Sequence, residues 1–315
     1  MTIETLLKEL SSEIDVLLSS DFDIEVIETD RVPNIDDSDL TYDNFDRKIK
    51  KCKVIDTCVL YIDIRKSTAL NISHRPQTLT KLYSSFIRSM VKAVEYFDGY
   101  VRNIVGDRIM VVFNSFNCFS NAVNTAILLN TIGNHIIDDK FKLNDIKLGV
   151  GIDYGKMMVV KAGTIKQGQE NQFYRSLVWL GKPANIASKL TDVANKVDID
   201  WGDKVMAGYH YPLADKWSWV SVDPIKFIKD LEVTYSPVIK HKNEYFSSFF
   251  LTKEDEINST PQILITENVY EGFCEEQPTA PSIINNWWNP QNISIPEYKG
   301  KIYGANTFFN CVKKI

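Results

Sequence analysis

The sequence predicts an α+β protein built on one antiparallel sheet, and three features after residue 50 indicate this fold. First, the run Thr57–Ile64 is apolar at consecutive positions, which is typical of a central strand covered on both faces. Second, apolar residues recur every three or four positions over Leu79–Val94, which predicts an amphipathic helix. Third, two strand-like runs, Tyr100–Val105 and Arg108–Phe113, flank Gly106-Asp107, a pair that favours a tight hairpin turn.

Further elements extend this pattern toward residue 194. Gly99 stands where the C-cap of the first helix is expected. The order of elements from Thr57 to Ile152 becomes β-α-β-β-α-β, the ferredoxin-like split βαβ arrangement, followed by an added hairpin and helix. The later elements are a helix at about Asn117–Ile137, strands Ile146–Ile152 and Lys156–Lys161 joined through Asp153-Tyr154-Gly155, and a helix with Pro183 in its first turn that ends near Ala194.

The two ends of the chain are expected to lie outside this core. Residues 1–50 begin with leucines and isoleucines at helical spacing and turn acidic at Asp36-Asp37-Ser38-Asp39, which predicts a helix and a polar linker. After about residue 197, tryptophans and valines predict strands, as does Tyr245–Leu251. Residues 252–315 are rich in Pro, Asn and Glu and form a C-terminal extension to which the sequence assigns no role.

Composition and charge narrow the classes of function. The chain has 315 residues, 44% of them hydrophobic, with 36 Lys and Arg against 41 Asp and Glu, a net charge of −5. No nucleic-acid partner is expected, because a general basic surface is lacking. Five widely spaced cysteines and only four histidines favour free thiols over zinc ligands. A basic leader and a membrane-spanning apolar run are both missing, so we expect a cytoplasmic protein without a membrane partner.

Two aspartates are candidates for a metal site. Asp63 stands at the end of a buried strand, where a charge is costly unless it is paired or bound to a metal, and Asp107 lies in the predicted hairpin turn. In a split βαβ sheet the first strand and the second hairpin are central neighbours, so the two carboxylates can converge. Two hard oxygen ligands suit Mg²⁺. The alternative is that Asp107 is only a turn residue and Asp63 a capped strand end.

A second candidate group opens the last helix. Asn185 and Lys189 are four residues apart and therefore share one helix face. An amide and an ammonium on one face could orient a ribose and neutralise a developing phosphate charge, although an ordinary solvated helix face is the alternative. The phosphate-loop signature GxxxxGK[ST] is missing from the sequence.

Together, these segments resemble the catalytic domain of class III nucleotidyl cyclases, over a region from about Val54 to Leu251. Four segments carry the resemblance in the family's order: YIDIRKST at 61–68, GDRIMVVF at 106–113, GVGIDYG at 149–155 and LGKPANIASK at 180–189. Each segment alone is loose, but four in the right order are specific. The resemblance therefore favours the metal interpretation of the two aspartates.

The resemblance implies a role for each candidate residue. Asp63, Ile64 and Asp107 would bind two divalent cations, Mg²⁺ or Mn²⁺. Asn185 would orient the ribose, and Lys189 would stabilise the transition state. The reaction would be attack of the ribose 3′-oxygen of a nucleoside triphosphate on its α-phosphorus, with pyrophosphate leaving.

The resemblance also implies a homodimer. Active sites of the family form between two head-to-tail catalytic domains, with the metals from one and the Asn and cation from the other. The catalytic domain would occupy residues 51–251, between the N-terminal segment 1–50 and the extension 252–315. By the same resemblance, either Lys240 or Lys242 would be the triphosphate-binding lysine of the family, and the sequence does not choose between them.

Three positions depart from the family pattern. The transition-state residue, usually arginine, is Lys189, which keeps the charge but loses the bidentate fork. The purine-recognising lysine position falls on Asn103, and the purine-recognising aspartate position falls on Val178. An adenylate or guanylate cyclase without these two groups has no obvious means of selecting its base.

Nearby, Arg175 and Trp179 fit the RxxxW pattern of the pyrimidine cyclases of bacterial Pycsar antiphage systems. Trp179 could fill the space that a purine needs, and Arg175 could donate to a pyrimidine carbonyl. The alternative is a strand with a salt-bridged arginine and a core tryptophan. We therefore expect a uridylate cyclase that makes cyclic UMP from UTP as an antiphage second messenger. A cytidylate cyclase acting on CTP is the close rival, and a catalytically silent nucleotide-binding module is the alternative of another class.

Overall fold

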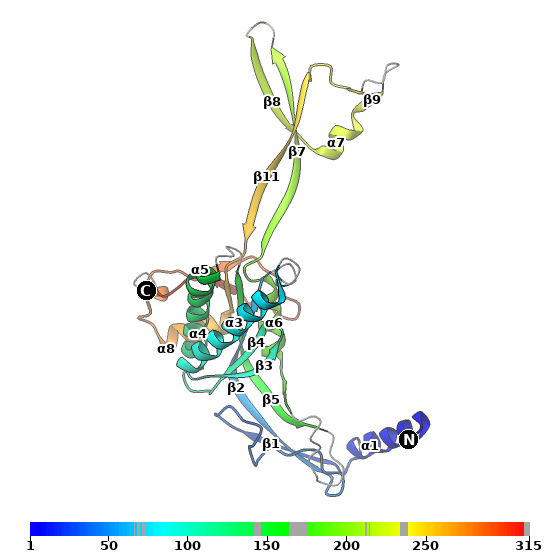
Figure 1. Cartoon of the computed structure of the whole chain (residues 1–315), viewed down its shortest axis with the longest axis vertical. Coiled ribbons are helices and arrows are strands. Elements are labelled where there is room, and N and C mark those ends of the chain that lie inside the picture. The colour runs from blue at the N-terminus through cyan, green and yellow to red at the C-terminus, as the bar shows by residue number, and fades with distance from the viewer. Residues whose placement is uncertain are drawn as a thin grey trace. The chain divides into compact units, whose positions relative to one another are not determined.

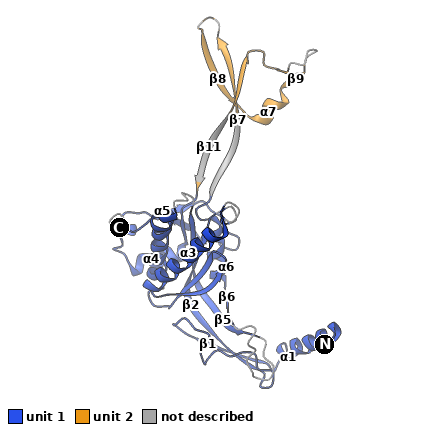
Figure 2. Cartoon of the chain, in the orientation of Figure 1, with its two compact units in different colours: residues 1–196, 260–315 blue, residues 197–259 orange. Residues whose placement is uncertain are grey.

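The computed structural model describes residues 1–65, 67, 70, 74–141, 146–163, 176–211, 213, 215–233 and 239–311, apart from the side chains of 197–204 and 252–258 (Figure 1). The chain forms two compact units, Met1–Lys196 with Thr260–Ile315, and Val197–Ser259 (Figure 2). This division differs from the expected segments 1–50, 51–251 and 252–315, because strands from both ends of the chain join the sheet of the first unit.

The first unit carries the candidate aspartates and the helix that follows Gly181. Its elements are α1 (Ile3–Leu17), β1 (Asp23–Glu28), β2 (Ile49–Ile64), α3 (Pro76–Tyr96), β3 (Gly99–Val105), β4 (Arg108–Phe113), α4 (Cys118–Ile132), the π-helix η1 (Gly133–Ile137), α5 (Asp138–Phe141), β5 (Leu148–Ala162), β6 (Ser176–Leu180), α6 (Lys182–Val193), β12 (Ile263–Thr266), α8 (Glu267–Glu276), α9 (Pro281–Ile284), β13 (Asn289–Gln291) and β14 (Ile302–Ala305).

Within the described residues, these strands form one nine-stranded sheet in the order β13-β14-β12-β5-β2-β4-β3, with β1 beside β2 and β6 beside β5. The central order β5-β2-β4-β3 is that of the split βαβ arrangement, with α3 and α4 as its two connecting helices. β2 pairs antiparallel with both β4 and β5, while β1–β2 and β12–β5 are parallel. The predicted α+β fold with a mainly antiparallel sheet is confirmed.

The two faces of this sheet bury different clusters. On the α3/α4 face, Leu60 and Ile62 of β2 pack in one buried cluster with Phe86 of α3 and Leu129 of α4. On the α6 face, the buried cluster contains Val59 of β2, Met110 and Val112 of β4, Met157 and Val159 of β5, and Ala184 and Ala187 of α6. Alternating β2 residues face opposite sides, so Asp63 lies on the same side as Val59.

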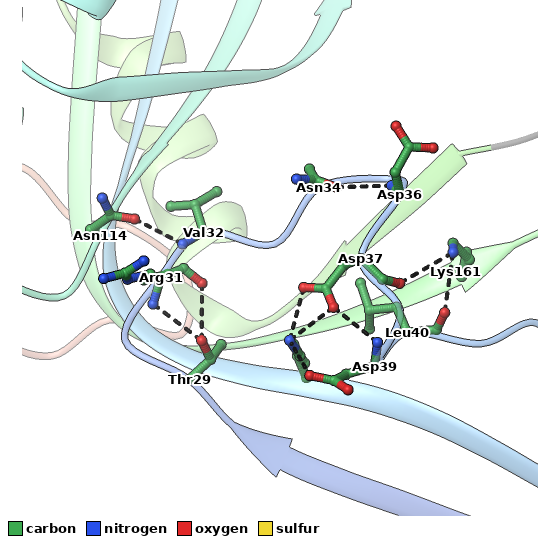
Figure 3. Close-up of polar contacts among 11 residues, drawn as sticks. Thr29, Arg31, Val32, Asn34, Asp36, Asp37, Asp39, Leu40, Asn114 and Lys161 are labelled. Atoms are coloured by element: carbon green, nitrogen blue, oxygen red, sulfur yellow. Dashed lines mark hydrogen bonds and ion pairs between the residues drawn. The ribbon is translucent and has the colours of Figure 1, made fainter.

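The residues between β1 and β2 form part of the α6 face rather than a free polar linker. Val32 and Leu40 are buried in its cluster. Lys53 Nζ donates to Asp37 Oδ2 at 2.8 Å, and Lys161 Nζ donates to the carbonyl of Leu40 at 3.1 Å (Figure 3). The carboxylates of Asp37 and Asp39 thus pair with Lys53 of β2, while Lys161 of β5 donates to backbone carbonyls of the same segment. The predicted helix at the N-terminus is present as α1, although none of its residues is buried.

The hairpin that holds Asp107 is as predicted, but the end of the preceding helix is not. Val105 of β3 pairs with Arg108 of β4, and Gly106 has φ 63°. The prediction of Gly99 as a helix C-cap is wrong, because α3 ends at Tyr96 with Phe97 as its C-cap, and Gly99 begins β3. A Cβ at Gly99 would lie 2.8 Å from the Phe113 ring, so close packing requires glycine there.

The predicted turn through residues 153–155 is also wrong. β5 runs unbroken through these residues and pairs with β2 from Leu148 to Val159. Asp153 resembles a turn residue in the sequence, but its carboxylate is buried and accepts a hydrogen bond from the Thr266 hydroxyl at 2.8 Å. Gly155, with φ 154°, lies under Pro183 of α6.

The second unit contains the strands expected after residue 197. Its elements are β7 (Val197–Tyr211), β8 (Lys216–Val222), α7 (Pro224–Lys229), β9 (Leu231–Val233), β10 (Ile239–His241) and β11 (Ser248–Ser259). β11, β7 and β8 form an antiparallel sheet, on which Trp217 and Trp219 stack with ring centroids 5.7 Å apart. Among the described residues of both units, we find no helix that is long and apolar enough to cross a membrane.

Candidate active site

The structure brings Asp63 and Asp107 together. Ile62 of β2 pairs with Ile109 of β4, so the end of β2 lies beside the hairpin turn. The backbone N–H of Ile64 donates to Asp107 Oδ2 at 3.2 Å. Burial and the hydrogen-bonded carboxyl of Asp63 raise the pKa of Asp107 to about 6. Two carboxyl groups in contact form a centre of negative charge at the edge of the α6 face.

An arginine that the sequence did not single out neutralises part of this charge. Arg108 Nη2 donates to Asp63 Oδ2 at 2.8 Å and also pairs with Asp192 of α6. Arg108 Nη1 donates to the hydroxyl of Ser188 at 3.0 Å. The only sequence signal is its place next to Asp107. Arg108 therefore connects the aspartate pair to α6 of the same chain.

A second arginine, Arg65, fixes the end of β2 against the end of α6. Its guanidinium donates to the carbonyls of Thr191 and Asp192. The guanidinium lies over Gly149 of β5, where any Cβ would collide with it. Burial lowers the pKa of Arg65. A glycine in β5 thus makes the space that this half-buried guanidinium needs.

The donor set at Asp63 and Asp107 fits a hard divalent cation. Two carboxylates supply oxygen ligands, and Ile64, an apolar residue, can contribute only its backbone carbonyl. Among the described residues, no group of three or more His, Cys, Asp or Glu side chains gathers in a way that would hold a metal on its own. A site with two carboxylates and few other protein ligands is typical of Mg²⁺ that also binds substrate phosphates.

Asn185 and Lys189 lie on α6, which packs tightly on the sheet. A Cβ at Gly151 of β5 would lie 2.7 Å from Leu190 Cβ, so glycine permits the close approach. Asn185 is exposed. Lys189 Nζ donates to the carbonyl of Pro296 at 3.4 Å and lies 3.6 Å from Glu297 Oε2. The catalytic roles of both residues remain predictions.

The segments expected to face the base lie on β3 and β6. Trp179 is half-buried and packs against the cluster of the α6 face, with Val178 beside it in β6. Asn103 is exposed on β3, in register with Met110 of β4. Arg175 lies outside the described residues. The second unit holds the remaining candidates, Lys240 in β10 and Lys242, whose Nζ is 3.9 Å from Asp230 Oδ1.

The chain is similar to known nucleotide cyclases. A family model described as the adenylate and guanylate cyclase catalytic domain matches residues 49–220. A uridylate cyclase of Gulbenkiania mobilis is 30% identical over 195 residues, which cover 58% of this chain and 69% of that protein. A cytidylate cyclase of Escherichia coli is 24% identical over 208 residues, which cover 60% and 44%. The crystal structure of the adenylyl cyclase CyaB from P. aeruginosa aligns with a TM-score of 0.47 and 16% identity, covering 80% of this chain and 94% of that one. The family match includes β2, β4 and α6, the elements around the aspartate pair.

Proposed function

The chain belongs to the adenylate and guanylate cyclase catalytic domain family, and on that premise we propose that it is a pyrimidine nucleotide cyclase that converts UTP to 3′,5′-cyclic UMP and pyrophosphate. The observation that carries the proposal is the meeting of Asp63 and Asp107 at the β2 end and the β3–β4 turn. A uridylate cyclase at 30% identity supports the choice of uridine.

In the proposed reaction the ribose 3′-oxygen attacks the α-phosphorus, the bond from that phosphorus to the β-phosphate oxygen breaks, and pyrophosphate leaves. Bound Mg²⁺ or Mn²⁺ would make the 3′-hydroxyl more acidic and neutralise the triphosphate. Asp63, Asp107 and the carbonyl of Ile64 would hold these ions. Asn185 would orient the ribose, and Lys189 would neutralise charge that develops on the α-phosphate. Lys240 or Lys242 would bind the triphosphate.

The active site would be shared between two copies of the chain. Asp63 is paired to α6 of its own chain through Arg108 and Asp192, while Asn185, farther toward the start of α6, is exposed. An exposed amide is free to act on a nucleotide held by a second copy. We therefore propose a homodimer with two composite sites, in which one chain supplies the metal aspartates and the other supplies Asn185 and Lys189.

Selection of a pyrimidine would rest on what has replaced the purine-recognising groups. Asn103 and Val178 occupy those positions, and the Trp179 ring lies in β6 immediately before α6. A large ring beside the base leaves less room for a purine. The cytidylate cyclase of Escherichia coli supports CTP as the second candidate substrate. The RxxxW pattern at Arg175 and Trp179 supports a second-messenger role in antiphage defence.

The proposal is tested by incubating the purified chain with Mn²⁺ and each of the four ribonucleoside triphosphates, with mass spectrometry of the products. We expect cyclic UMP as the main product. Asp63→Asn, with unchanged thermal unfolding, should give none. Turnover of ATP or GTP as fast as UTP would contradict the pyrimidine assignment, and a clear preference for CTP would contradict only the choice of uridine. No cyclic product from a folded chain would favour the silent nucleotide-binding module.

A further inference from the structure

Arg102 is placed by an irregularity in β3. The register between β3 and β4 shifts between Val101 and Asn103, so Arg102 is the extra residue of a β-bulge and opposes no residue of β4. A bulge turns a side chain away from the direction that strict alternation would give it. The sequence does not reveal this, because nothing in the run from Gly99 to Val105 marks a bulge.

The bulge directs the Arg102 guanidinium across the α6 face toward β6. Its Cζ is 5.1 Å from the centroid of the Tyr100 ring and 6.0 Å from the centroid of the Trp179 ring. The side chain is half-buried between these aromatic groups. Arg102 therefore links the two strands, β3 and β6, that carry Asn103 and Trp179.

The N–H groups of Arg102 and Trp179 lack most of the hydrogen-bond acceptors that they could use. Among the described residues, the buried Nε of Arg102 and the buried Nε1 of Trp179 each have no hydrogen-bond acceptor. Arg102 Nη1 reaches only the carbonyl of Val101, at 3.5 Å. Burial lowers the pKa of Arg102, and no carboxylate of the described residues forms an ion pair with it. Buried N–H donors without acceptors are costly, and each such donor in a folded protein calls for an explanation, of which a bound ligand is one.

We propose that Arg102 and the indole N–H of Trp179 donate hydrogen bonds to a carbonyl oxygen of the pyrimidine ring, which makes Arg102 a specificity-determining residue. This inference rests on the proposed cyclase function. Both groups can only donate, so they select a base edge that only accepts. Uracil offers two carbonyl oxygens and cytosine offers one, whereas adenine has none and would place an amino group against these donors.

The placement agrees with a composite site. β6 leads directly through Gly181 into α6, so Trp179 and Asn185 belong to one continuous segment. The chain that orients the ribose is then also the chain that recognises the base. Guanine, which has a carbonyl, is excluded by size, because the Trp179 ring occupies the space next to Arg102.

The first test compares Arg102→Met, which keeps an unbranched stem, with Arg88→Met, a matched change of an exposed arginine on α3. We expect Arg102→Met to lower kcat/KM for UTP by about tenfold to a hundredfold, the usual effect of removing a charged donor from a bound acceptor. Its kcat/KM for ATP should not fall, so the ratio of the two should drop. Arg88→Met should change neither value. Thermal unfolding of both variants should stay within about 2 °C of wild type.

The second test separates donation from volume at Trp179. Trp179→Phe removes the N–H and keeps most of the ring, so UTP turnover should fall while purines stay excluded. Trp179→Ala removes the ring and should admit ATP. In the wild type, UTP analogues with sulfur in place of O2 or of O4 should show which carbonyl is bound, because a thiocarbonyl accepts hydrogen bonds weakly. The Arg102→Met variant should turn over UTP and the analogue that wild type uses poorly at similar rates, because the hydrogen bond that distinguishes them is gone.

Failure of this inference can be told apart from failure of the proposed function. If the wild type cyclises pyrimidines but neither thio analogue is impaired, and Arg102→Met keeps the wild-type ratio of UTP to ATP, Arg102 only packs against the two rings. If the wild type cyclises nothing, calorimetric binding of 3′-deoxyuridine and 3′-deoxyadenosine triphosphates decides. A preference for the uridine compound that Arg102→Met or Arg102→Lys abolishes supports the inference, and equal binding of the two by wild type overturns it.

Discussion

The two faces of the large sheet differ in the kind of side chains that they bury. On the α3/α4 face, β2, β4 and β5 bury a large apolar cluster under α3, α4 and α8, and Leu60, Ile62 and Phe86 are fully buried. On the α6 face, the same strands also carry Asp63 and Asp153, and the face includes buried donors that no described residue satisfies. The first face is covered by helices of the same chain. On the second face, we propose, a nucleotide binds and a second copy of the chain supplies the remaining active-site residues.

The glycines of β5 sharpen this contrast. Gly149 admits the Arg65 guanidinium, and Gly151 admits the backbone of α6. Both lie on the α6 face, while Leu148, Val150 and Ile152 alternate with them and fill the opposite core. β5 thus places large apolar side chains on the α3/α4 face and glycines, which allow close approach, on the α6 face. The stability of the fold and the chemistry of the site should therefore respond to different substitutions.

The largest expected effect is on the α6 face. Asp107→Asn or Asp63→Asn should reduce cyclic nucleotide formation by at least about a thousandfold, because each removes a charge that the metal site needs. Asp56→Asn changes an exposed aspartate on the same strand, β2, and should leave turnover near wild type. Product formation measured by mass spectrometry, with unfolding curves for each variant, checks this. An active Asp107→Asn enzyme would remove the basis for the metal assignment.

A substitution on the α3/α4 face should do the reverse. Phe86→Ala removes a fully buried ring from the core and should lower the free energy of unfolding by about 3–5 kcal/mol. The ratio of UTP to ATP turnover should not change at temperatures where the variant is folded. Phe116→Ala, at a ring that is 80% exposed, is the matched control and should be neutral. A shift in base preference in Phe86→Ala would mean that the two faces are not independent.

A smaller effect is expected at Asp153, a buried carboxyl on the α6 face. Burial raises its pKa from 3.8 to about 6, so the folded state holds its proton more tightly than the unfolded state. Its contribution to stability is therefore fully present below about pH 4 and is lost as pH rises through about 6. Asp153→Asn keeps an acceptor for Thr266 and removes the charge. Its free energy of unfolding in urea should exceed that of wild type by about 2–3 kcal/mol at neutral pH, with no gain near pH 4. A gain that is equal at both pH values would contradict this assignment.

The sequence predicted most of the core, because its signals were local. The Gly106-Asp107 turn and the apolar periods of α3 and β2 depend only on neighbouring residues. The Asp153-Tyr154-Gly155 segment was misinterpreted because Asp and Gly mark turns, whereas here Thr266, more than a hundred residues later, satisfies the aspartate in a continuous strand. β12 lies in the extension to which the sequence assigned no role, because its place beside β5 depends on pairing between residues more than a hundred positions apart.

Within the site, the sequence found the carboxylates and missed the cations around them. The meeting of Asp63 and Asp107 follows from strand order, which the split βαβ pattern predicts. Arg65 and Arg108 form hydrogen bonds with α6, and Arg102 reaches β6 from a β-bulge. The residues next to these arginines in the sequence give no sign of these partners. An arginine side chain is long and flexible, so its partner can be identified only once the fold is known.

The central claim is that the α6 face is completed by a second copy, and mixing two inactive chains tests it most directly. Asp63→Ala chains lack the metal site, and Lys189→Ala chains lack the transition-state cation. Each should be inactive alone. After subunit exchange, half of the dimers are mixed and each mixed dimer has one intact site, so activity should return to about a quarter of wild type. No recovery, although native mass spectrometry shows mixed dimers, would place all catalytic groups in a single chain and contradict the account.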